Sequence, residues 1–159
     1  MKLNERIKVL YELGSFLELY CDNSKKIKLN EFYKKLEIAI NDSILLNPYF
    51  EKENIIYNLN CWSKILQKSN LESFVSQHDL NDKISNVGII MAGNIPLVGF
   101  HDFLCVFLSG NKSSVKLSRK DSSLFKFIID FLINQSSEIS TYVEFVENKL
   151  ANYDAIIAT

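Results

Sequence analysis

Residues 86–97 read Asn-Val-Gly-Ile-Ile-Met-Ala-Gly-Asn-Ile-Pro-Leu, and this stretch decides the fold. The run from Val87 to Ala92 is almost continuously apolar, which is typical of a strand buried on both faces of a parallel sheet. Gly93 ends the run, and Pro96 suits the first turn of a helix, where a missing N–H leaves no hydrogen bond unmade. The stretch therefore predicts a strand, a short loop and a helix.

The residues that follow repeat this alternation. The helix that starts near Pro96 is expected to end at Gly110-Asn111. Asp121 is predicted to cap the next helix, whose apolar face comprises Leu124, Phe127, Ile128 and Phe131. Three further strands are expected, over residues 113–117, 142–146 and 153–158. This order predicts an α/β fold with right-handed crossovers and a doubly wound, Rossmann-like parallel sheet.

The residues before position 84 show a helical pattern, because apolar side chains recur three or four positions apart. The apolar positions of three expected helices are Leu3, Ile7, Leu10, Leu13 and Leu17; Leu29, Phe32, Leu36 and Ile40; and Ile55, Leu59, Trp62 and Leu66. Asn47-Pro48 separates the second helix from the third, since the residue before a proline is pushed away from the helical region. A short fourth helix is expected over residues 71–78, followed by a turn at Asn81-Asp82.

The bulk composition narrows the class of protein. A chain of 159 residues with 47% hydrophobic and 23% charged residues is typical of a globular domain with an apolar core. A net charge of −1 excludes a broad electrostatic surface for nucleic acid. We expect no signal peptide and no membrane span. The three cysteines are far apart and form no metal-binding pattern, so we expect reduced thiols in a cytoplasmic protein without a metal site.

We expect the chain to divide into a helical region, residues 1–83, and an α/β segment, residues 84–159, of the type that often binds nucleotides. In open α/β sheets the loop after each strand builds the ligand site. Thr159 follows the last expected strand directly, with no loop and no covering helix after it. We therefore expect that the α/β segment is incomplete at its C-terminus and that the chain is the front part of a larger enzyme.

The loop after the first strand offers groups that suit a negatively charged ligand. Backbone N–H groups at Gly93 and the carboxamide of Asn94 lie near the start of the expected helix, whose positive dipole end favours anions. The glycine-rich Rossmann fingerprint is missing from this loop. From the residues alone, Asn94 is either a donor to an oxyanion or a helix cap.

The second strand ends in the basic residues Lys116, Arg119 and Lys120, with Ser118 among them. In nucleotide-binding sheets this position contacts the adenosine ribose, where carboxylates favour a free 2′-hydroxyl and cations favour a 2′-phosphate. No acid occurs in this stretch until Asp121. The alternative reading is a solvated charged turn before a helix.

Taken together, these elements resemble the aldehyde dehydrogenase superfamily. Its members show a strand, an Asn-Phe-Pro-Leu turn, a helix ending in Gly-Asn, and a strand ending in Lys-Pro-Ser-Glu. Residues 91–104, Met-Ala-Gly-Asn-Ile-Pro-Leu-Val-Gly-Phe-His-Asp-Phe-Leu, are more closely similar to the bacterial acyl-CoA reductase family, which is related to the fatty-acid reductase of bacterial light-emission operons. The similarity extends to the helical half, notably at residues 47–50 and Trp62, and to residues 153–159, which resemble the strand leading into the family's Gly-Ser cofactor loop.

The resemblance implies an NADPH-dependent acyl-CoA reductase, in which a cysteine attacks an acyl thioester and a hydride releases the aldehyde. It implies that Asn94 helps to hold the oxyanion and that Lys116 with Ser118 binds the cofactor ribose. The family's proline and glutamate are replaced here by Leu117 and Arg119, which favours NADP over NAD. The substrate would be an acyl-CoA or another acyl thioester, and the complete enzyme could be a homo-oligomer.

The nucleophilic cysteine of that family lies in a second half that residues 1–159 do not contain. Cys105 is expected in the middle of a helix with no nearby cation to lower its pKa, and Cys61 is expected on a packed helical face. His101 and Asp102 would point about 100° apart on a helix and would not form a dyad. The alternative functions are a non-catalytic nucleotide-binding or assembly module, or a degenerate fragment.

Overall fold

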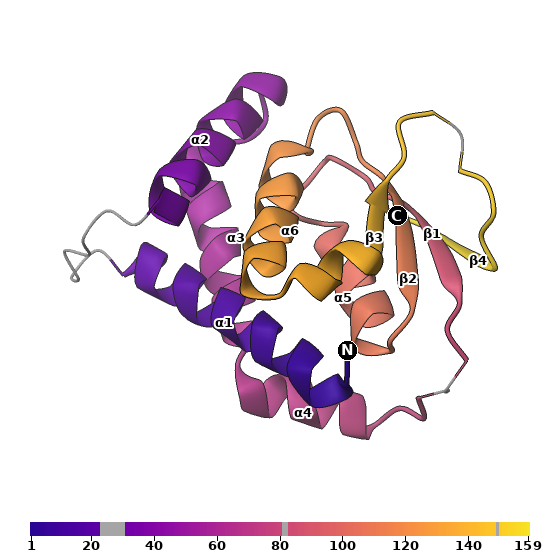
Figure 1. Ribbon diagram of the computed structural model, residues 1–159. Coiled ribbons are helices and arrows are strands. Elements are labelled where there is room, and N and C mark those ends of the chain that lie inside the picture. Colours follow the sequence, from indigo (N-terminus) through magenta and orange to yellow (C-terminus); the bar gives the residue numbers. More distant parts are fainter. Residues whose placement is uncertain (23–30, 81–82, 149) are drawn as a thin grey trace.

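The computed structural model describes residues 1–22, 31–80, 83–148 and 150–159 (Figure 1). Four helices come first: α1 (Leu3–Cys21), α2 (Glu31–Leu46), α3 (Lys52–Ile65) and α4 (Lys68–Ser76). The α/β part follows with β1 (Asn86–Ile90), α5 (Phe100–Leu108), β2 (Lys112–Lys116), α6 (Ser123–Gln135), the 3-10 helix η1 (Ser137–Thr141), β3 (Val143–Phe145) and β4 (Ala155–Ala158). The predicted helical start and the alternation after it are confirmed, whereas Leu29 and the turn at Asn81-Asp82 lie outside the described residues.

The strands form one parallel sheet in the order β3-β2-β1-β4. In its register Ile90 of β1 lies beside Lys116 of β2, and Ile89 lies beside Ile157 of β4. This confirms an α/β fold in which helices precede a four-stranded parallel sheet and alternate with its strands. Because the strands run in the same direction, the loops after β1 and β2 emerge at one edge of the sheet.

One face of the sheet packs against the helices. The side chains of Val87, Ile89 and Val115 are buried on this face, since alternate residues of a strand point to the same side. The rings of Phe103 on α5 and Phe125 on α6 are 5.5 Å apart, so these two helices share one layer. In Figure 1 the helices gather on the left of the view and β1, β2 and β4 lie on the right.

The other face of the sheet is more polar than the apolar run in β1 predicts. The Ser114 hydroxyl donates a hydrogen bond to Glu144 Oε1 at 2.6 Å, and Asn86 Nδ2 donates to Ser114 Oγ at 3.0 Å. Around Gly88 this face is covered by the side chains of Leu150 and Tyr153. The expectation of burial on both faces holds for Val87–Ile89 of β1 but not for the exposed Ile90, and it does not extend to β2, where lysine and serine alternate on this face.

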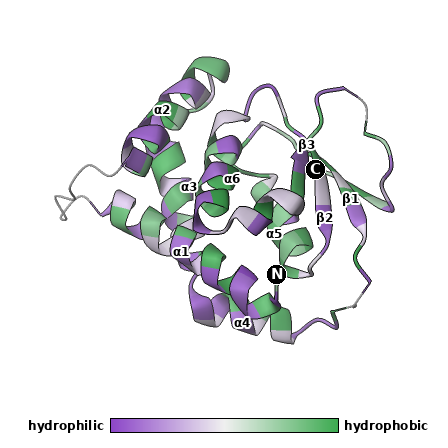
Figure 2. Ribbon diagram, in the orientation of Figure 1, coloured by the Kyte–Doolittle hydropathy of each residue, from purple (hydrophilic) through white to green (hydrophobic). Residues whose placement is uncertain are grey.

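The N-terminal helices pack on the outer side of α5 and α6 through aromatic side chains. Phe16 of α1 lies 4.8 Å from Phe131 of α6 between ring centroids, and Trp62 of α3 lies 4.6 Å from Phe100 of α5. Figure 2 shows the matching pattern, with apolar residues dominating α5 and hydrophilic residues recurring along the outer helices. Burial of such large rings is the main favourable term in the packing of these layers. Within the described residues, no helix is long and apolar enough to cross a membrane.

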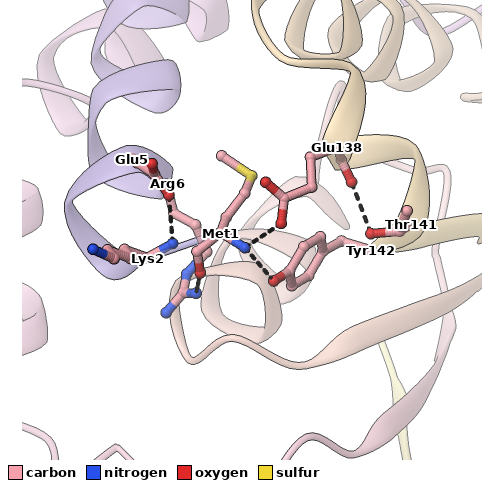
Figure 3. A network of polar contacts seen from close by, with 7 residues as sticks. All are labelled: Met1, Lys2, Glu5, Arg6, Glu138, Thr141 and Tyr142. Carbon is pink, nitrogen blue, oxygen red and sulfur yellow. Dashed lines mark hydrogen bonds and ion pairs between the residues drawn. The ribbon is translucent and has the colours of Figure 1, made fainter.

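The start of α1 is tied to the α/β part by a polar network (Figure 3). The Met1 ammonium donates hydrogen bonds to Glu138 and, at 2.9 Å, to the Tyr142 hydroxyl. The buried Arg6 guanidinium donates to the carbonyl oxygens of Met1 at 2.7 Å and Leu108 at 3.2 Å. Arginine therefore satisfies carbonyl groups at the start of α1 and at the end of α5, and it couples the two elements.

Two predicted helix starts are wrong. Leu97 has φ +60°, which no α-helix tolerates, so Pro96 lies in a turn and α5 begins at Phe100. The residue that precedes α6 is Ser122, and Asp121 does not cap this helix. The predicted end of α5 is confirmed, because Gly110 has φ +85°, a conformation that favours glycine.

Candidate functional site

The residues that the sequence singled out lie at one edge of the sheet, where β1 and β2 end. Residues 91–99, here called the β1–α5 loop, carry Gly93 and Asn94. Residues 116–120, here called the basic segment, begin at the last residue of β2. The backbone N–H of Met91 donates to the Lys116 carbonyl at 3.0 Å, which continues the parallel pairing into both segments. The β1–α5 loop and the basic segment therefore start side by side at this edge of the sheet.

Gly93 lies directly against the basic segment. A Cβ atom at this position would lie 2.2 Å from the Ser118 hydroxyl oxygen and 2.8 Å from Ser118 Cβ, closer than any side chain permits. The Ser118 hydroxyl itself accepts a hydrogen bond from the Lys120 backbone N–H at 3.2 Å. Glycine is required at position 93 because the two segments approach each other so closely.

Asn94 is exposed and makes no hydrogen bond within the part of the chain that the structure describes. It precedes Gly99, the residue at the N-cap of α5, by more than one helical turn. The helix-cap reading of Asn94 is therefore wrong, since a cap must be adjacent to the first helical turn. The carboxamide remains available to a ligand at this edge.

The basic segment presents unpaired positive charge. Arg119 and Lys120 are exposed, Lys116 is half-buried, and within the described residues none of the three forms an ion pair. Ser118 is half-buried between these cations. Cations without a carboxylate partner are suited to a bound anion such as a phosphate group, which an arginine can contact with two parallel hydrogen bonds.

Asp121 has a structural position that its sequence pattern did not reveal. Its carboxyl group is buried, with 4% of the residue exposed, and its Oδ2 accepts a hydrogen bond from the Leu97 backbone N–H at 2.7 Å. Burial raises the pKa of the Asp121 carboxyl to about 6, although the hydrogen bond from Leu97 opposes this rise. Asp121 thus connects the end of the basic segment to the β1–α5 loop.

Asn47 connects the same loop to the helical region. Its Nδ2 donates a hydrogen bond to the Gly93 carbonyl at 2.9 Å, and its Oδ1 accepts one from the Tyr49 backbone N–H at 3.1 Å. The second bond is a local turn that Asn-Pro sequences favour. The bond to Gly93 spans 46 positions of the chain, and no local pattern in the sequence signals it.

Neither Cys21 nor Cys105 has the surroundings of a nucleophile. Burial raises the pKa of the Cys21 thiol to about 11, and burial together with Asp102 raises that of Cys105. The structure places the His101 ring beside Cys105, with 3.8 Å between Nε2 and Sγ. The thiol of Cys105 nevertheless stays protonated at neutral pH.

The N-terminus of α5 is occupied by an acid. Asp102 lies in the first helical turn, and its carboxylate accepts a hydrogen bond from the Thr159 hydroxyl. His101 Nδ1 is 4.0 Å from Asp102 Oδ1, which is too long for a hydrogen bond and agrees with the prediction that they form no dyad. A carboxylate at this helix start repels a second anion, so the positive charge at this edge comes from the basic segment. Within the described residues, no group of acids, cysteines and histidines could hold a metal ion.

No known family model matches the chain, and no curated protein sequence matches it. Fold and site together define an α/β protein whose parallel sheet carries an amide-bearing loop and a cationic segment at its carboxyl edge.

Proposed function

We propose that this chain is the N-terminal, NADPH-binding portion of an acyl-CoA reductase with an aldehyde-dehydrogenase-like fold. The complete enzyme would reduce a fatty acyl thioester to an aldehyde through a cysteine acyl-enzyme. The observation that carries the proposal is the close contact of Gly93, the residue before Asn94, with the basic segment at one edge of the sheet. In this proposal the nucleophilic cysteine lies outside residues 1–159.

The strand order supports a Rossmann-like, doubly wound arrangement. β1 lies between β2 and β4, and the chain leaves β1 toward β2 on one side while β4 pairs on the other. In open α/β sheets this point of reversal, at the carboxyl ends of the strands, is where ligands bind. The β1–α5 loop emerges at this point, which supports a cofactor site there.

The donor set fits the cofactor. Lys116, Arg119 and Lys120 have no carboxylate partner within the described residues, and a 2′-phosphate adds nearly two negative charges to the ribose. Arg119 would contact this phosphate, and Lys116 with Ser118 would contact the ribose. When bound, NADPH supplies the hydride for reduction of the acyl group.

Asn94 has the role of an oxyanion donor in this proposal. Its exposed carboxamide has no partner within the described residues that would compete with a ligand, and Asn94 does not cap α5. An amide N–H donates a hydrogen bond to a negatively charged oxygen that develops as the thioester is attacked. We place the enzyme in the cytoplasm, which agrees with three free cysteines.

The test compares NADPH and NADH in calorimetric titrations of the unmodified chain and of Arg119→Glu. We expect NADPH to bind about 10- to 100-fold more tightly than NADH, corresponding to about 1.4–2.7 kcal/mol, and Arg119→Glu to abolish this preference. Added salt should weaken NADPH binding more, because only NADPH uses the additional charge pair.

The matched control is Lys126→Glu, which changes charge equally at an exposed position of α6. It should leave the preference for NADPH unchanged. Equal dissociation constants for the two cofactors in the unmodified chain would contradict the proposal. They would favour the alternative interpretation of the basic segment as a solvated charged turn.

A further inference from the structure

The β1–α5 loop contains an unfavourable backbone conformation that the chain holds in place. Leu97 has φ +60°, a left-handed conformation that side chains other than glycine, asparagine and aspartate rarely adopt. Its side chain is buried, with 2% exposed, so the loop is anchored in the core at this residue. A conformation of this kind persists only when surrounding groups hold it.

The group that holds it is Asp121. Its Oδ2 accepts the Leu97 amide hydrogen at 2.7 Å, and no other acceptor contacts this N–H within the described residues. The second oxygen, Oδ1, is buried without a hydrogen-bond partner within the same residues. A buried carboxylate with one oxygen that has no partner stabilises the fold less than a neutral acceptor would. The neutral group would bind the same N–H without the penalty for burying charge.

The position of this hydrogen bond links three parts of the site. Asp121 follows the basic segment directly, and Leu97 lies three positions after Asn94 in the β1–α5 loop. Gly93, at the other end of this stretch, is fixed by the Asn47 side chain and by contact with Ser118. Asn94 therefore lies between two fixed points, one at Gly93 and one at Leu97.

We propose that Asp121 is a positioning residue, which accepts the Leu97 amide hydrogen and thereby holds Asn94 at the carboxyl edge of the sheet. The catalytic consequence for Asn94 rests on the proposed function, whereas the positioning itself does not. Asp121 touches neither substrate nor cofactor in this account and acts only through the loop.

The test is amide hydrogen exchange by NMR on the chain without cofactor. In the unmodified chain, the Leu97 amide should exchange slowly although it lies in a loop. Asp121→Asn keeps an oxygen acceptor and should preserve this protection. Asp121→Ala and Asp121→Leu remove the acceptor, and each should accelerate exchange at Leu97 at least 10-fold while Ile89 in β1 stays protected.

Two further readouts separate positioning from general destabilisation. In Asp121→Ala the side-chain amide signal of Asn94 should shift and sharpen, and in Asp121→Asn it should match the unmodified chain. Ser122→Ala is the control, because Ser122 makes no side-chain capping bond. Fast exchange at Leu97 in the unmodified chain would overturn the proposal, as would unchanged protection in a folded Asp121→Ala or Asp121→Leu. Since no cofactor is present, a failure here is distinct from equal binding of NADPH and NADH.

Discussion

At the scale of single residues, Asn94 carries the chemical part of the proposed function. The residue is exposed, lies outside α5 and makes no hydrogen bond within the described residues, so its removal should not affect folding. Asn94→Ala in the complete enzyme should lower kcat by about 10²–10³-fold, the usual loss for one oxyanion donor. The melting temperature of the variant and its affinity for NADPH should equal those of the unmodified enzyme. An unchanged kcat would contradict the assignment of Asn94 as an oxyanion donor.

Asp121 makes stability depend on pH in a definite direction. The pKa of its carboxyl is about 6 in the folded protein against an ordinary value of 3.8, so the folded state binds this proton more tightly. Its contribution to stability is therefore greatest below about pH 4, falls as the pH rises to about 6, and is level above that. Raising the pKa of Asp121 from 3.8 to about 6 corresponds to about 3 kcal/mol of stability at most.

Asp121→Asn cannot titrate and should remove this dependence. Urea unfolding of both proteins between pH 4 and pH 7 measures the effect. The free energy of unfolding of the variant, relative to the unmodified chain, should increase from pH 4 to pH 6 and then stay constant. Parallel stability curves over this range would show that the Asp121 carboxyl titrates normally.

At the scale of elements, the contact between the β1–α5 loop and the basic segment depends on Gly93. Gly93→Ala places Cβ 2.2 Å from the Ser118 hydroxyl oxygen, so the two segments must separate. We expect a loss of about 1–3 kcal/mol in the free energy of unfolding, the usual range for overpacking, together with weaker NADPH binding.

Gly88→Ala is the matched control for this substitution, because its Cβ would meet Leu150 and Tyr153 at an ordinary 3.4 Å. It should change the free energy of unfolding by less than about 1 kcal/mol. Ser118→Gly removes the clashing atoms and should partly restore stability to Gly93→Ala. Equal losses for the two glycine variants in denaturant unfolding would show that the close approach at Gly93 is not limiting.

The elements also show which features the sequence predicts. The strands around residues 87–90 and 113–116 and the end of α5 at Gly110 are predicted correctly, because periodicity and glycine are local signals. The start of α5 is predicted wrongly, since the conformation of Leu97 depends on Asp121, 24 positions away. The hydrogen bond from Asn47 to Gly93 is missed for the same reason. Long-range polar contacts leave no periodic pattern in a sequence.

At the scale of the whole molecule, the grouping of candidate site residues follows from topology. Parallel strands end at the same edge, so the adjacency of β1 and β2 brings the loop with Gly93 and Asn94 to the segment with Lys116, Ser118 and Arg119. The second face of the sheet is polar because Ser114 of β2 points to it and bonds to Glu144. The register of β2, which the sequence does not show, decides this. The helical region packs on α5 and α6, and Asn47 donates a hydrogen bond to the site loop at Gly93.

The central claim is that the carboxyl edge of this sheet binds NADPH. Hydrogen exchange of the unmodified chain, with and without saturating NADPH, tests the location directly. We predict slower exchange in residues 91–99 and 116–121 and no change in residues 137–143, which lie at the opposite end of β2 and β3. Protection confined to residues 137–143, or no protection anywhere at saturating NADPH, would contradict the account.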